Sequence, residues 1–119
     1  MAKINSFNFG SIVVDGKQYV YDVLILPDGT VKEREASKAR LGGHSIIWSD
    51  VEKMVKEQPE TIVIGTGTSG LARLSADVEV NLQQANLNLV VLQSLQAIEK
   101  FNQLVDERKR VAALIHITC

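Results

Sequence analysis

Apolar residues change their spacing along the chain near residue 45. Before that point, short apolar stretches are separated by turn residues, which is typical of antiparallel strands. After it, apolar residues at helical spacing alternate with short continuous apolar runs, which predicts helices between buried strands. The pattern therefore predicts an antiparallel N-terminal meander followed by a β-α-β-α-β segment.

Two turns are predicted in the N-terminal part. Asp15-Gly16 suits a two-residue hairpin turn, because both central positions of that turn need positive φ. Residues 17–26 are predicted to form one long strand, and the Pro-Asp-Gly turn at 27–29 returns the chain into a strand that begins TVKER. Asp22 alternates onto an apolar face of the long strand. We expect it to pair with Arg34 in the adjacent strand, and a role as a base is the alternative.

Three helices are predicted after residue 45. Ser49 and Glu52 fit a capping box that opens the first helix. The second is expected from Ser75 to about Ala85 and the third from Ser94. The sequences TIVI, LNLVVL and VAALIHI are predicted strands. Since strand–helix–strand units favour right-handed crossovers and parallel strands, we expect a single α/β domain over residues 1–119, with helices covering a mixed sheet of about five or six strands.

The segment TIVIGTGTSG joins a predicted buried strand to a glycine loop at residues 65–70. The loop matches the G-x-G-x-x-G pattern of dinucleotide sites and lies where α/β sheets bind ligands. Two features disfavour a dinucleotide: the best helix start is only at Ser75, and no acidic residue ends the next strand. A turn required by geometry alone is the favoured interpretation. The alternative is a pocket for a small anion or a partner's backbone, with a candidate set of Gly65, Thr66, Gly67, Thr68 and Ser69.

Arg34 and His44 flank the charged connection between the meander and the first helix. The functional interpretation is a flap whose Arg34 and His44 face the glycine loop, and the favoured one is a solvated connection. A metal site is not expected, because zinc needs three or four protein ligands and the chain offers only His44, His116 and Cys119 as histidine and cysteine ligands. No cofactor is expected.

Composition limits the classes of function. The chain has 119 residues, with 13 basic and 14 acidic side chains, whereas a general nucleic-acid binder carries a basic excess. The single cysteine fits a reducing compartment. No apolar run reaches the roughly 20 residues that cross a bilayer, and the N-terminus lacks the apolar core of a secretory signal. We therefore expect a cytoplasmic protein without membrane insertion.

Several segments together resemble a known family: YVYDV with the PDG turn, His44, TIVIGTG, the helix QAIEKFNQLV and the ending AALIHITC. The chain resembles a family of small domains of unknown function. The family includes an adipogenesis-associated vertebrate protein, a mitochondrial respiratory complex I assembly factor and stand-alone archaeal and bacterial members. The resemblance implies a three-layer α/β/α fold with a mixed central sheet, and it implies no established enzymatic activity. The charged VKERE after the PDG turn departs from relatives that often have aromatic residues there.

Two functions follow as hypotheses. The first is a non-catalytic protein-interaction or assembly-type module, because the sequence contains no catalytic constellation. The alternative is a binder of, or an enzyme acting on, a small anionic molecule through the glycine loop at residues 65–70. The partner is thus an unknown protein or a small anion, and a homo-oligomer formed through a strand edge is compatible with both.

Overall fold

The computed structural model describes residues 2–34 and 45–119. Its main sheet has five strands in the order β5-β4-β10-β7-β9, namely β5 (Val31–Glu33), β4 (Val23–Ile25), β10 (Val111–Ile115), β7 (Thr61–Gly65) and β9 (Asn88–Leu92). β7 is parallel to both β9 and β10, whereas β4 is antiparallel to β10 and to β5. The sheet is therefore mixed, as predicted.

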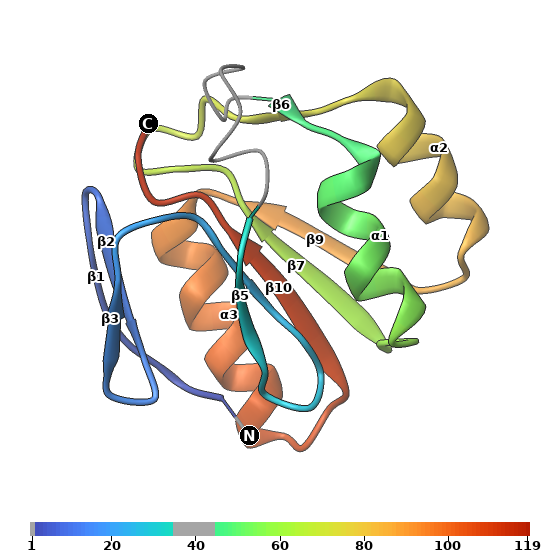
Figure 1. Cartoon of the computed structure of the whole chain (residues 1–119). Helices are drawn as coiled ribbons and strands as arrows, with labels where there is room; N and C mark the ends of the chain where they lie inside the picture. Colours follow the sequence, from blue (N-terminus) through green and yellow to red (C-terminus); the bar gives the residue numbers. More distant parts are fainter. Residues whose placement is uncertain (1, 35–44) are drawn as a thin grey trace.

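Helices cover both faces of this sheet (Figure 1). α3 (Ser94–Asp106) packs on one face, with Phe101 and Val63 in a shared apolar core. α1 (Trp48–Lys56) and α2 (Ala76–Gln84) pack on the other face, in a second core that contains Ile62 and Leu114. Every residue of β7 and β10 is buried, because their continuous apolar sequences lie between these two layers. The expected layered α/β fold is confirmed.

The N-terminal strands form a separate sheet of three antiparallel strands, β1 (Ile4–Asn8), β2 (Ser11–Val14) and β3 (Lys17–Tyr19). The predicted hairpin turn is confirmed, with φ of 49° at Asp15 and 80° at Gly16. The turn at residues 27–29 also forms, and its Gly29 N–H donates to the Leu26 carbonyl at 2.9 Å.

The prediction of one long strand over residues 17–26 is wrong. The chain bends at Val20 and Tyr21, so that β3 belongs to the small sheet and β4 to the main sheet. The bend lets Asp22 point into the interior, where its Oδ1 accepts the Ile117 N–H at 2.9 Å. Local alternation cannot reveal this contact, because Ile117 is separated from Asp22 by 95 positions.

The helix boundaries follow the sequence at most positions. α2 and α3 begin next to Ser75 and at Ser94, and Asn86 takes a φ of 55° after α2. The cap of α1 differs from the prediction: the residue before the helix is Ile47, and Asp50 accepts its N–H at 3.0 Å. Two short strands, β6 (Ser45–Ile46) and β8 (Arg73–Leu74), form a small parallel sheet ahead of α1 and α2.

Candidate functional site: a pocket beside the edge strand β9

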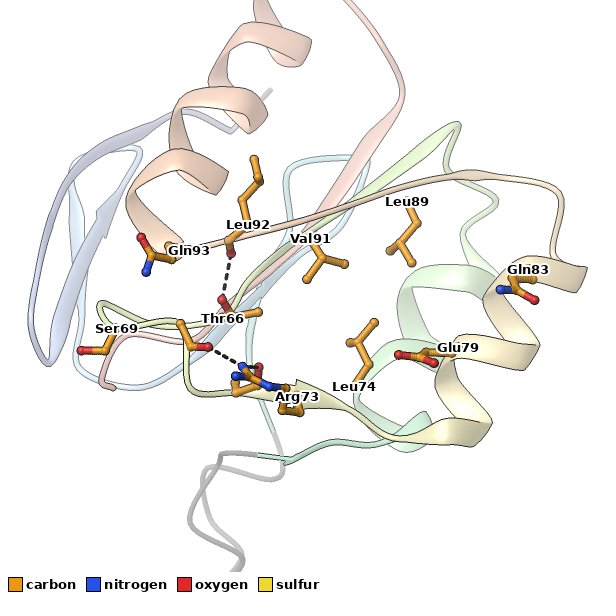
Figure 2. A pocket seen from close by; sticks show the side chains of 12 residues that line it. Thr66, Ser69, Arg73, Leu74, Glu79, Gln83, Leu89, Val91, Leu92 and Gln93 are labelled. Atoms are coloured by element: carbon orange, nitrogen blue, oxygen red, sulfur yellow. Dashed lines mark hydrogen bonds between the residues drawn. The ribbon is translucent and has the colours of Figure 1, made fainter.

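A pocket of about 530 Å³ lies beside β9 at one edge of the main sheet (Figure 2). Its walls come from β9, from the middle and the C-terminal end of α2, from β8, and from the loop that follows β7. This volume falls in the range of small-molecule sites, and it also suits one or two peptide side chains. The lining residues are Thr66, Ser69, Gly70, Ala72, Arg73, Leu74, Glu79, Gln83, Leu89, Val91, Leu92 and Gln93.

β9 offers an open edge above this pocket. It pairs with β7 on one side, and no strand within residues 2–34 and 45–119 pairs with its other side. The Asn88 N–H donates to Glu60 and the Leu92 carbonyl accepts from Thr66, so these residues direct their backbone groups toward β7. Since backbone direction alternates along a strand, the N–H and C=O groups of Leu89 and Val91 point away from the sheet.

The side chains along β9 are apolar and partly exposed. Leu89 is 36% and Val91 41% exposed, and both point toward Leu74 across the pocket (Figure 2). Leu92 points to the opposite face (Figure 2), and Leu95 in the first turn of α3 is 55% exposed. Residues 80–98 include no Asp, Glu, Lys, Arg or His. β9 itself therefore has no charged side chain, and no strand of the described residues uses the hydrogen-bonding groups on its outer side.

Two charged side chains stand at opposite ends of the pocket (Figure 2). Arg73 lies near Thr66 and donates through Nη1 to the carbonyls of Gly70 and Ala72. Glu79 lies on α2, on the side of Leu89. The pocket consequently has an apolar middle with a cation at the glycine-loop end and a carboxylate at the other end.

Hydrogen bonds and close packing with neighbouring residues hold the glycine loop in place. The Thr66 amide donates to the Leu92 carbonyl at 2.9 Å, and the Gly67 amide donates to Ser94 Oγ at 2.8 Å. The Thr68 amide donates to the Thr118 carbonyl at 2.7 Å, and the Gly70 amide donates to the Gly67 carbonyl at 3.3 Å. A Cβ atom on Gly67 would lie 2.4 Å from the Cys119 carbonyl carbon, and one on Gly65 would lie 2.8 Å from Ser94 Oγ. These glycines are required for close packing, and four amides of the expected anion nest already have protein acceptors.

The structure separates the residues that the sequence grouped into one site. Thr66 and Ser69 line the pocket together with Gly70, whereas its described lining does not include Gly65, Gly67 or Thr68. His44 lies outside the described residues. The pocket residues that sequence reasoning missed include Arg73, Glu79, Leu89 and Val91. The available signal was the uncharged stretch over residues 80–98, which is unusual for a chain with 23% charged residues.

Arg34 is fully buried and lies in a network with interior carboxylates. Its Nη1 donates to Asp22 Oδ2 at 2.7 Å, and its Nη2 donates to Asp50 Oδ2 at 3.1 Å and to the Ser45 carbonyl at 2.7 Å. The expected pair of Asp22 with Arg34 is confirmed. The favoured interpretation of a solvated connection is wrong for Arg34, because its buried guanidinium donates to two interior carboxylates. The alternative flap also needs His44, which lies outside the described residues, and stays a prediction.

His116 completes this buried network. Its Nδ1 lies 2.7 Å from Asp22 Oδ2, and its Nε2 lies 3.2 Å from Thr118 Oγ1. Burial alone would raise the pKa of Asp22, but hydrogen bonds from His116, the Ile117 amide and Arg34 hold that pKa below its ordinary value. The network connects the C-terminal segment to Asp22, the residue before β4. It thereby holds in place the residues that pack against Gly67 of the glycine loop.

Across residues 2–34 and 45–119, no group of three or more His, Cys, Asp and Glu side chains is arranged to hold a metal ion. Over the same residues, no helix has the length and apolar character needed to cross a membrane.

Solved structures share this fold over nearly the whole chain. The protein MT938 is 30% identical, with all of both chains covered and a TM-score of 0.82. A conserved hypothetical protein, PH1505 from Pyrococcus horikoshii OT3, is 28% identical over 98% of this chain and 99% of its own, with a TM-score of 0.85. A protein described as an outer membrane protein from Bartonella henselae is 22% identical over 99% of this chain and 96% of its own, with a TM-score of 0.83, and shows the fold alone.

A family model agrees with these structural matches. The model described as "Protein of unknown function (DUF498/DUF598)" matches residues 4–116, which is nearly the full length of the chain. Neither this description nor those of MT938 and PH1505 names a catalytic activity. The chain therefore belongs to the DUF498/DUF598 family of proteins of unknown function.

Proposed function

We propose that this protein is a non-catalytic interaction module that binds an extended protein segment along the open edge of β9. The observation that carries the proposal is the combination of outward-facing backbone groups at Leu89 and Val91 with a pocket directly beside them. In strand addition, main-chain hydrogen bonds supply affinity, and pockets for alternate side chains supply specificity. The apolar middle of this pocket suits one large apolar side chain of the added segment.

The other edge of the sheet supports this assignment by contrast. β5 is three residues long and includes Lys32 and Glu33, which are charged residues of the kind that protect an edge from pairing. β9 is five residues long, and Asn88 is its one polar side chain. Edges of this second kind are commonly covered in the cell, because an exposed apolar edge strand invites aggregation.

The finer features of the proposal come from the sequence. The net charge of −1 favours a protein partner over nucleic acid, and we place the protein in the cytoplasm. The family that the sequence resembles includes a mitochondrial complex I assembly factor, which acts through protein contacts, and this resemblance supports the same kind of role here. This role needs neither a cofactor nor a metal ion.

A matched pair of lysine variants tests the proposal. Val91→Lys places a charge on the edge, whereas Val20→Lys places the same charge at a site that is 71% exposed and belongs to the bend outside the main sheet. Affinity capture from source cells, quantified by mass spectrometry, is expected to return the same proteins for the wild type and Val20→Lys. We expect Val91→Lys to lose them. Equal recovery by all three baits would refute an interaction through β9.

A small amphipathic anion is the second candidate ligand, because Arg73, Thr66 and Ser69 meet the apolar wall of the pocket at one end. A panel of carboxylates and phosphates would be screened by thermal shift. A ligand at 100 times its Kd adds about 2.7 kcal/mol of stability. The shift is expected in the wild type and not in Arg73→Gln. A panel without any shift at millimolar concentration would remove this candidate.

A further inference from the structure

We propose that the extended segment bound at β9 is the β9 strand of a second copy of this chain, paired antiparallel across a two-fold axis at Val90. The inference rests on the proposed function and names its partner. Two five-stranded sheets would join edge to edge into one continuous sheet. The two pockets would then lie on the same face, on either side of the axis.

The backbone direction of β9 restricts the register of such a pair, and a centre at Val90 allows all five strand residues to overlap. Leu89 and Val91 face outward, whereas Val90 faces β7. A pair centred on Val90 therefore places Leu89 opposite Val91 of the partner subunit at both ends, so that outward groups meet outward groups. A shift by one residue would place outward groups opposite inward ones and lose the ladder. The strand is thus self-complementary without any change in its conformation.

The side chains satisfy the same symmetry. Residues directly opposite each other in an antiparallel pair share a face, so Leu89 would contact Val91 of the partner subunit on the pocket face. A charge near a two-fold axis meets its own copy, which is unfavourable. Residues 80–98 include no charged side chain, and Val80, Leu89, Val91, Leu92 and Leu95 are exposed large hydrophobic residues within that stretch. Because the strand itself carries no charge, a second copy can pair with it without placing like charges opposite each other.

Light scattering coupled to size exclusion tests the assembly. The wild type and Val20→Lys are expected at twice the 13.1 kDa of one chain. Val91→Lys puts a lysine beside the axis in each copy, and we expect it to raise the dimer Kd at least about tenfold, because desolvating a charge at this apolar contact is unfavourable. A wild type that stays monomeric up to about 100 μM, or a dimer whose Kd does not change in Val91→Lys, would overturn the inference.

Cysteine crosslinking tests the register itself, in a background where Cys119→Ser removes the native thiol. Val90→Cys places two thiols across the axis at a pair with a Cα separation of about 4.5 Å, which a disulfide can bridge. Leu92→Cys is the matched control, because the two copies of residue 92 would lie about 13 Å or more apart. Oxidation is expected to crosslink the first variant and not the second. Equal crosslinking, or none in Val90→Cys, would contradict the register.

The failures of the two proposals can be told apart. A monomeric wild type whose captured partners are lost in Val91→Lys would refute the second copy and leave strand addition at β9 in place. A monomer whose captured proteins do not depend on Val91 would refute both. Circular dichroism of each variant is the control for correct folding. The crosslinking comparison does not depend on the lysine variant.

Discussion

At the scale of single residues, the buried cluster of Asp22, Arg34, Asp50 and His116 is the most demanding feature of the molecule. Each member is at most 5% exposed, so each charge depends on its partners inside the protein. Asp22 is the hub: its Oδ2 is shared by Arg34 and His116, and its Oδ1 accepts the Ile117 amide. Removing one partner of a buried pair typically costs about 3–5 kcal/mol, because a charge is left uncompensated.

The lowered pKa of Asp22 predicts a loss of stability in acid. Its folded-state pKa lies below the ordinary 3.8, so the unfolded chain binds the proton more readily. The stabilisation is present above 3.8 and is lost as the pH falls through the folded-state pKa. We expect the free energy of unfolding, measured by urea titration from pH 6 to pH 3, to fall more steeply in the wild type than in Asp22→Asn. Equal slopes would show that Asp22 does not contribute this pH dependence.

Part of this cluster could be predicted from sequence and part could not. The pair of Asp22 with Arg34 followed from an acid on an apolar strand face and a base in the returning strand. His116 is separated from Asp22 by 94 positions. Nothing in the local pattern around His116 indicates that contact, because the C-terminal segment reaches Asp22 only after the sheet has formed.

At the scale of elements, the apolar spacing predicted the buried strands β7 and β10 and all three helices, because burial on both faces imposes a strong signal. The start of α1 was predicted less well. Asp50 accepts hydrogen bonds both from the Ile47 N–H at the start of the helix and from the Arg34 side chain. The contact with Arg34 is tertiary, so the local sequence could not show that Asp50, and not Ser49, caps the helix. The glycine loop also shows that local sequence does not reveal tertiary contacts. Its pattern is typical of phosphate binding, but here Gly67 packs closely against the C-terminal residues.

Two glycine variants separate close packing from backbone conformation. Gly67 has a φ of 108° and no room for a Cβ atom beside Cys119, whereas Gly10 has a φ of 86° and no neighbouring heavy atom within 4 Å of a built Cβ. Gly10→Ala is expected to cost about 1 kcal/mol, from the backbone alone. Gly67→Ala is expected to cost about 3 kcal/mol or more, because backbone atoms must also move. Urea denaturation measures the loss of unfolding free energy in each variant. Equal losses would argue against tight packing of Gly67 against Cys119.

At the scale of the whole molecule, the site lies at the edge of the sheet and not at its centre. The sequence predicted β9 as a strand but could not reveal that no described strand follows it in the sheet. Strand order depends on which faces the helices cover, and this information is distributed over the whole chain. The consequence is that LNLVVL, which has the sequence of a covered strand, presents Leu89 and Val91 to solvent.

Amide hydrogen exchange can detect whether this edge is covered. The outward N–H of Leu89 has no acceptor among the described residues, whereas the Val90 N–H lies in the ladder with β7. In dilute protein, Leu89 is therefore expected to exchange rapidly and Val90 slowly. As the concentration rises, Leu89 should become protected while the exchange of Val90 changes little, because association adds a hydrogen bond only to the outward group. Slow exchange of Leu89 in samples that light scattering shows to be monomeric would mean that the chain covers its own edge, and strand addition at β9 would then be impossible.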